Sequence, residues 1–181
     1  MTAAPTVPLP SLSPVLVQAT HVVVMGVAGC GKSAVGQRIA SALQLPMVEG
    51  DDFHPETNVQ RMRQGIALTD TDRAGWLALL GEVLQQHPGG AVLSCSALKR
   101  SYRDRLRRAI PSLSFVYLEI TPAESQRRVA ARAGHFYPPS LVDSQFAALE
   151  DPSGEAGVLV LDGSASLEQV AAQAVVWLGA R

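Results

Sequence analysis

The sequence predicts an α/β protein in which helices cover both faces of a five-stranded parallel sheet. Short apolar runs alternate with helical patterns along the chain, and this alternation is typical of parallel strands joined by right-handed helical crossovers. A glycine-rich segment separates the first apolar run from the first helix. The 181 residues, 47% of them hydrophobic, suit one compact domain with a buried core. We therefore expect a single domain over residues 21–181.

The predicted strands are short apolar runs bounded by polar or glycine-rich segments. Residues 21–25 are mostly valine, which indicates a strand buried on both faces. Similar runs cover 91–95, 115–120 and 158–161, and a weaker run covers 46–49. Helical periodicity predicts helices over 32–43, 71–86, 99–110, 123–133 and 167–178. In such sheets ligands bind at the carboxyl ends of the strands, so we expect the site there.

Three segments lie outside this pattern. Residues 1–20 contain no lysine or arginine and several prolines, which argues against a secretory signal and predicts a flexible tail. Residues 50–70 and about 134–140 interrupt the alternation, and we interpret them as a substrate-binding segment and a small lid. The apolar helix faces that contain Trp76 and Trp177 are expected to pack in the core or in a dimer interface rather than to stack on a ligand.

Composition narrows the class of function. The formal net charge is −1 and the predicted pI is about 6.4, so the basic field that a nucleic-acid partner requires is missing. The longest apolar stretch is too short for a bilayer span. The only two cysteines, Cys30 and Cys95, do not suggest a disulfide framework. These features predict a soluble, cytoplasmic protein.

Residues 26–33 read Gly-Val-Ala-Gly-Cys-Gly-Lys-Ser and match the P-loop pattern directly between a strand and a helix. Glycines let backbone N–H groups converge on phosphate oxygens, and the helix start adds a positive dipole end. Lys32 is expected to reach the β- and γ-phosphates of ATP, and Ser33 to hold Mg²⁺. The predicted nucleotide-binding residues here are Gly26, Val27, Ala28, Gly29, Cys30, Gly31, Lys32, Ser33 and Ala34.

Cys30 and the two lysines of the chain are further candidates for a special role. Cys30 is either an inert packing residue or a thiol whose pKa is lowered by the helix start. Lys32 and Lys99 are the only lysines among fifteen basic residues. Where arginine serves as the general cation, a retained lysine suggests a position that requires a compact ammonium group.

The segment after the second predicted strand is acidic and reads Glu-Gly-Asp-Asp-Phe-His-Pro over residues 49–55. A carboxylate there would face the same crevice as the P-loop and could orient an acceptor hydroxyl or hold Mg²⁺ through water. The alternative is helix capping, because an acid before Pro55 suits a helix start. Capping fits Asp52 better than Asp51.

Taken together, several segments of the chain resemble gluconate kinases. They are residues 22–33, 50–55 with Asn58, Arg61 and Met62, 65–76, 95–99, 102–104 and 132–136. The resemblance spans residues 21–178 and implies a three-layer P-loop NTPase fold with strand order 2-3-1-4-5. It also implies ATP-dependent phosphorylation of D-gluconate at its 6-hydroxyl by an enzyme that forms homodimers, with Asp51 orienting or deprotonating that hydroxyl and Glu49 near Mg²⁺.

A gluconate pocket requires a cation and several hydrogen-bonding groups. The candidates are His54, Arg61, Lys99, Arg103 and the lid residue His135. Lys99 and Arg103 have i, i+4 spacing, which places them on one face of the predicted helix. Two alternatives stand: Arg103 belongs to a solvated basic face, and His54 is only a helix-start residue.

Arg128 and Arg132 lie one helical turn apart before the predicted lid. Guanidinium groups brought over the γ-phosphate would stabilise the transferring charge, so both are predicted to contact ATP, and Arg132 to be catalytic. Arg127 is assigned to the surface, and residues 162–164 resemble an adenine-contacting loop. The alternatives are another small-metabolite kinase, such as a shikimate kinase, and a nucleotide-dependent switch, although the chain has neither Asn-Lys-x-Asp nor Leu-Ser-Gly-Gly-Gln.

Overall fold

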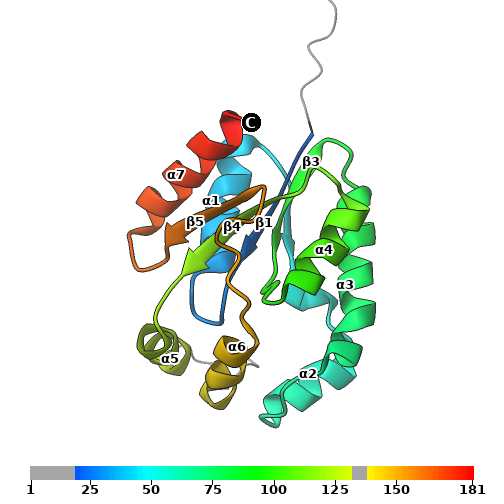
Figure 1. The fold of residues 1–181 in the computed structure, drawn as a ribbon, viewed down its shortest axis with the longest axis vertical. Coiled ribbons are helices and arrows are strands. Elements are labelled where there is room, and N and C mark those ends of the chain that lie inside the picture. The colour runs from blue at the N-terminus through cyan, green and yellow to red at the C-terminus, as the bar shows by residue number, and fades with distance from the viewer. Residues whose placement is uncertain (1–18, 132–137) are drawn as a thin grey trace, which may run out of the picture.

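A five-stranded parallel sheet with the order β2-β3-β1-β4-β5 forms the centre of the molecule (Figure 1). The computed structural model describes residues 19–131 and 138–181. The strands are β1 (Thr20–Met25), β2 (Met47–Glu49), β3 (Gly90–Ser94), β4 (Ser114–Glu119) and β5 (Val158–Asp162). All five predicted strands are confirmed to within one residue at each end, and so is the strand order.

Seven α-helices occur in the described residues. They are α1 (Lys32–Leu43), α2 (Glu56–Arg63), α3 (Asp70–Gln85), α4 (Arg100–Ala109), α5 (Pro122–Ala131), α6 (Val142–Ala148) and α7 (Leu167–Gly179). The five predicted helices are present. The short helices α2 and α6 were not predicted, because they lie in or beside the segments interpreted as insertions and span only two turns each.

The side chains of β1 alternate between the two layers of helices. Val22 and Val24 pack with α1 and α7 on one face of the sheet, whereas Val23 and Met25 pack with α3 and α4 on the other. All four are fully buried, as expected of a central strand covered on both faces. The packing role predicted for Trp76 is confirmed, since Trp76 is buried in the α3–α4 layer.

The carboxyl ends of the strands define one edge of the molecule. Figure 1 shows α2, α5 and α6 at the end toward which the arrows of β1 and β4 point.

None of the helices in the described part of the chain combines the length and the apolar composition that a bilayer span requires. Most of the predicted tail and most of the predicted lid lie outside the described residues.

Candidate functional site

The P-loop turn between β1 and α1 depends on three glycines. Gly26, Gly29 and Gly31 have φ angles of 139°, 76° and 99°, a region that side chains disfavour. A Cβ atom on Gly26 would lie 2.8 Å from both the carbonyl oxygen of Leu118 and Cys30 Sγ. Gly31 is the N-cap of α1 and no side chain caps this helix start, so its first N–H groups are suited to an anionic ligand.

Two helices hold the peptide groups at the middle of this loop. The backbone N–H of Ala28 donates to Gln145 Oε1 on α6 at 2.5 Å, and the carbonyl of Ala28 accepts from Ser125 Oγ on α5 at 2.7 Å. Arg128 on α5 donates to the carbonyls of Gly29 at 3.4 Å and Gly163 at 2.9 Å. Hydrogen bonds from α5 and α6 therefore hold the P-loop in place.

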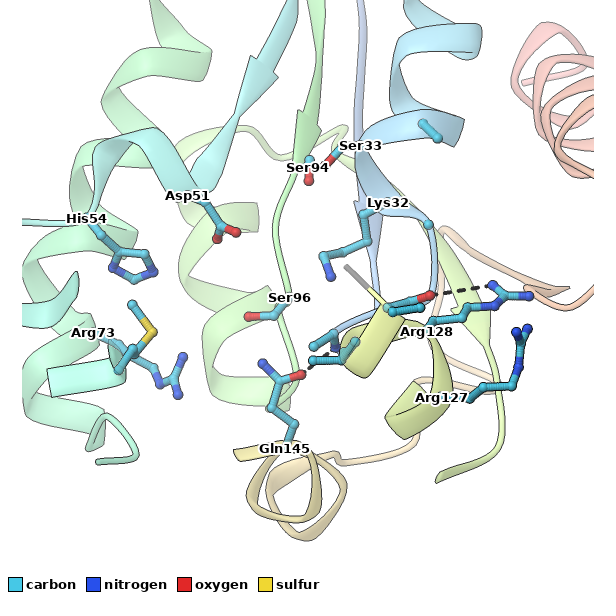
Figure 2. Close-up of a pocket in the computed structure, with 17 residues that line it drawn as sticks. Lys32, Ser33, Asp51, His54, Arg73, Ser94, Ser96, Arg127, Arg128 and Gln145 are labelled. Carbon is cyan, nitrogen blue, oxygen red and sulfur yellow. Dashed lines mark hydrogen bonds between the residues drawn. The ribbon is translucent and has the colours of Figure 1, made fainter. Parts of the chain in front are cut away.

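A cavity of ≈ 490 Å³ opens beside the P-loop, and Figure 2 shows the side chains around it. Its walls come from the P-loop, α1, α5 and α6, and from the end of β3, the segment after β2, α2 and α3. It is lined by Ala28, Gly29, Gly31, Lys32, Ser33, Ala34, Asp51, His54, Met62, Arg73, Ser94, Ser96, Arg127, Arg128, Val129, Ala131 and Gln145. The structure thus brings together the predicted Lys32, Ser33, Asp51, His54 and Arg128.

Asp51 lies in a 3₁₀ turn, Gly50–Phe53, that follows β2 directly. The turn packs so tightly against β3 that a Cβ on Gly50 would lie 2.4 Å from the carbonyl oxygen of Ser94. Trp76 Nε1 donates to the carbonyl of Gly50 at 2.8 Å. Contacts from two elements therefore fix the direction in which Asp51 enters the cavity.

His54 stacks on Trp76, with 4.1 Å between ring centroids and 16° between planes. Burial, and then the positive charge of Arg73, lower the pKa of His54 from 6.5 to about 4. The imidazole is therefore neutral at pH 7, and its buried Nδ1 has no hydrogen-bond partner among the described residues. This arrangement is more specific than the helix-start role considered from the sequence.

Arg73 is a cavity residue that sequence reasoning missed. It lies in the first turn of α3, just after the capping box formed by Thr69 and Asp72. A cation in a first helical turn faces the positive end of the helix dipole, and this unfavourable placement was the signal that could have identified it. Among the described residues, the hydrogen bond found for its guanidinium is a long one of 3.5 Å to the carbonyl of Leu68.

Ser94, Ser96 and Gln145 also line the cavity without having been predicted as site residues. The two serines lie at the carboxyl end of β3, where ligands to parallel sheets bind, and that position was a usable signal. Gln145 had no such signal, since its helix was not predicted. Arg127, which the sequence assigned to the surface, lies at the cavity rim with 69% of its side chain exposed.

Two predicted substrate residues lie outside the cavity lining and bind acids of α3. Lys99 Nζ donates to both carboxylate oxygens of Asp70, at 2.7 and 2.9 Å, and the hydroxyl of Tyr102 donates to the same carboxylate. Arg61 lies 3.7 Å from the carboxylate of Asp72. The structure therefore uses both cations to hold the start of α3.

The prediction that Arg103 binds substrate does not fit its position. Its side chain is fully buried and pairs with Glu155, and it donates to the carbonyls of Ala97, Leu98 and Glu150. Lys99 is the N-cap of α4 with extended backbone angles, so the i, i+4 argument that placed the two cations on one helical face was wrong. The basic-face alternative is equally wrong for a side chain with no exposed surface.

Three other expectations have different outcomes. Arg132 and His135 lie outside the described residues, so their roles stay predictions. Burial raises the pKa of the Cys30 thiol, which contradicts the lowered thiol pKa considered from the sequence and agrees with a packing role. Both cysteines are free and buried.

The site has the chemistry of a phosphoryl-transfer centre. Lys32 and Arg128 supply positive charge beside the phosphate-binding loop, and Asp51 supplies a carboxylate across the cavity. No cluster of three or more His, Cys, Asp or Glu side chains suited to a metal occurs in residues 19–131 and 138–181. The Ser33 hydroxyl lies in the cavity lining at the start of α1 and is an oxygen donor that Mg²⁺ could take as a ligand.

Comparisons with known proteins agree with this chemistry. The shikimate kinase family model matches residues 28–151. A gluconokinase from Gluconobacter oxydans is 45% identical over 144 residues, which cover 78% of this chain and 81% of that protein. The thermoresistant gluconokinase of Escherichia coli is 40% identical over 157 residues, covering 84% of this chain and 90% of that protein.

Solved structures show the same relationship. The crystal structure of a gluconokinase from Sinorhizobium meliloti superposes with a TM-score of 0.83 at 44% identity and covers 90% of this chain and 93% of its own. Shikimate kinase from Aquifex aeolicus superposes with a TM-score of 0.62 at 14% identity, a likeness that extends to the fold alone.

The buried pair of Arg103 and Glu155 predicts a pH-dependent stability. Burial alone would raise the pKa of Glu155, but hydrogen bonds from Arg103 and Arg107 hold it below its ordinary value of 4.5. Because the folded-state pKa is depressed, the stabilisation is present above pH 4.5 and is lost as the pH falls through the folded-state pKa. Glu155→Gln should lower the free energy of unfolding at pH 7 by about 3 kcal/mol, and should flatten its acid dependence.

Urea unfolding at pH 7 and at several acidic pH values checks this prediction. Glu168→Gln is the matched control, because Glu168 pairs with Arg38 on the surface and its side chain is 71% exposed. That variant should change stability by less than about 1 kcal/mol. Acid slopes that are parallel in the wild type and Glu155→Gln would exclude the proposed coupling.

Proposed function

Because the chain belongs to the gluconokinase family of shikimate kinase-like P-loop kinases, we propose that it transfers the γ-phosphoryl group of ATP to the 6-hydroxyl of D-gluconate. The products are 6-phospho-D-gluconate and ADP. The observation that carries the proposal is that Asp51 and the P-loop residue Lys32 line opposite sides of one cavity (Figure 2). A phosphate donor and a hydroxyl acceptor would meet between them.

The nucleotide side of the cavity fits a triphosphate. Three glycines with positive φ bend the loop so that its backbone N–H groups can converge on phosphate oxygens, and a Cβ at Gly31 would meet nothing within 4 Å. Lys32 Nζ donates to the carbonyl of Val27 at 3.0 Å, and we propose that it turns to the β- and γ-phosphates when ATP binds. Ser33 would hold Mg²⁺, which neutralises charge on the phosphate oxygens. Arg128, already beside Gly29 and Gly163, would contact the nucleotide.

On the acceptor side Asp51 orients the 6-hydroxyl of gluconate and takes its proton as the oxygen attacks phosphorus. The attacking oxygen forms a bond to the γ-phosphorus while the bond to the β,γ-bridging oxygen breaks, and its electron pair leaves with ADP. The tight contact of Gly50 with β3 and the Trp76 hydrogen bond keep Asp51 in place. Such pre-organisation lowers the cost of reaching the reactive geometry.

Arg73 is the cation we propose for the gluconate carboxylate. It lines the cavity on the same side as Asp51 and His54, and a guanidinium group suits a carboxylate through paired hydrogen bonds. Neutral His54 would bind a hydroxyl of the sugar acid. Lys99 and Arg61, the cations favoured by the sequence, would first have to leave Asp70 and Asp72.

Several finer points stay predictions. Arg132 is proposed to stabilise the transferring phosphoryl group, and His135 to contact gluconate. Homodimer formation and a cytoplasmic location are also proposed, the latter supported by two free cysteines. The shikimate kinase alternative is less favoured, because the Aquifex enzyme is only 14% identical to this chain, whereas several gluconokinases are 40–45% identical.

An ADP-release assay with Mg-ATP tests the reaction. The acceptors are D-gluconate, shikimate, glycerate, hexoses and nucleoside monophosphates, and one reaction contains no acceptor. Gluconate should be the acceptor that stimulates turnover, and Lys32→Ala should nearly abolish it, because the β- and γ-phosphates lose their cation. Stimulation by a different acceptor would reject the proposed substrate, and no stimulation by any acceptor would favour the nucleotide switch.

Asp51→Asn should lower kcat by about 10²–10⁴-fold, because an amide cannot accept the hydroxyl proton. ATP affinity should stay near the wild-type value, since Asp51 lies across the cavity from the P-loop. The neighbouring Asp52 is exposed, which makes Asp52→Asn a matched control with near-normal turnover. Steady-state kinetics and ATP titration give both values, and normal turnover of Asp51→Asn would remove it from the catalytic residues.

Arg73→Met should raise the KM for gluconate by about 10–100-fold, the loss expected for a hydrogen-bonded charge pair. The rate with a neutral polyol such as D-glucitol should change much less, since that acceptor has no carboxylate. Arg63→Met, on the exposed side of α2, is the control. If Lys99→Met raises the KM for gluconate and Arg73→Met does not, the carboxylate lies beside Lys99 instead.

A further inference from the structure

Gln145 on α6 is a buried polar side chain that faces the reaction cavity. It is only 7% exposed, yet its amide belongs to the lining of the cavity. Burying an amide is costly unless its polar atoms are bonded, and Gln145 Oε1 meets this requirement by accepting the Ala28 N–H at 2.5 Å. The other end of the amide, Nε2, is a donor of two hydrogen bonds.

The Ala28 contact fixes which way this amide faces. A backbone N–H is only a donor, so the atom that it contacts must be the carbonyl oxygen of the side chain and not the nitrogen. Nε2 is then directed away from the P-loop. Figure 2 shows it pointing into the open part of the cavity, toward the side of Ser96. The amide is therefore a donor of fixed direction beside the phosphate-binding loop.

Lys32 places this donor relative to the phosphates. Lys32 Nζ is bound to the carbonyl of Val27, and Gln145 Oε1 to the N–H of the next residue, Ala28. The Lys32 ammonium group, which is proposed to bind the β- and γ-phosphates, therefore contacts the loop at Val27. The Gln145 amide contacts the loop at the next residue, Ala28. Both project into the space between the P-loop and Asp51 (Figure 2).

We propose that Gln145 is a catalytic residue whose Nε2 donates a hydrogen bond to an oxygen of the phosphoryl group during transfer. This rests on the proposed kinase function. The γ-phosphorus bonds to the gluconate 6-oxygen, its bond to the bridging oxygen breaks with the electron pair on ADP, and the hydroxyl proton passes to Asp51. Gln145 gives up no proton. It stabilises negative charge on the equatorial oxygens, as a pre-organised neutral donor does.

A purely structural role of Gln145 would have a different effect on the kinetics. If Gln145 only anchors the P-loop, losing it should resemble losing Ser125, which holds the same peptide from the other side through the Ala28 carbonyl. Ser125 is fully buried and is not part of the cavity lining. Ser125→Ala is therefore the matched control for anchoring without donation.

Gln145→Glu separates the two roles. A carboxylate oxygen still accepts the Ala28 N–H, but no donor remains toward the cavity. Because the carboxylate also adds a negative charge, the uncharged Gln145→Met is measured beside it, and loss of the donor should lower kcat in both variants. We expect kcat to fall by about 10²-fold, the cost of losing one donor to a developing oxyanion, both with gluconate and in basal ATP hydrolysis. Affinity for Mg-ADP, which lacks the γ-phosphate, should stay within about twofold of the wild type. Ser125→Ala should instead weaken Mg-ADP binding more than it lowers kcat.

Kinetics with and without gluconate, together with calorimetric titration of Mg-ADP, give these values. A Gln145→Glu enzyme with kcat within about threefold of the wild type would leave anchoring as the only role. A rate that falls with gluconate but not in basal hydrolysis would assign the amide to the acceptor and overturn the proposal. If gluconate fails to stimulate the wild type, the proposed function fails, whereas basal hydrolysis by Gln145→Glu still decides the role of Gln145.

Discussion

The turn from β1 into α1 is the constraint on which the site depends. β1 is buried on both faces, and the chain leaves it at Gly26, packed directly against Leu118 and Cys30. A loop of this path needs residues with positive φ, and three glycines supply them. The same path turns backbone N–H groups inward and exposes the Ala28 peptide to α5 and α6. Both helices that flank the nucleotide side therefore contact the same peptide group of this loop.

Strand order sets the distance that the reaction must span. β3 lies between β1 and β2, so the P-loop and the turn of Asp51 are about 10 Å apart, or two strand spacings. A triphosphate end and a sugar hydroxyl fit within that gap. Gly50 packs against the end of β3, and Trp76 holds both Gly50 and His54. The acceptor wall is therefore held by contacts with β3 and α3, and β3 also pairs with β1, the strand that leads into the P-loop.

The sequence predicted those parts of the molecule that local patterns determine. Short apolar runs identified every strand, and glycine spacing identified the P-loop with Lys32 and Ser33. Asp51 and His54 were found because they directly follow a strand. Two of the missed residues, Arg73 and Gln145, lie on helices and reach the cavity only through tertiary packing. No spacing within α6 indicates that Gln145 contacts Ala28, which precedes it by 117 positions.

The arginines show why residue type alone could not identify the substrate cation. The chain has nearly equal numbers of basic and acidic side chains, so most lysines and arginines can pair with a carboxylate. Whether such a pair forms decides whether the cation is available to a substrate. Arg103 satisfies its charge inside the protein with Glu155, because an unpaired buried guanidinium would be far too costly. Lys99 is likewise committed to Asp70. Arg73 instead lines the cavity, where its charge adds to the effect of burial in lowering the pKa of His54, and a cation in that position favours an anionic acceptor.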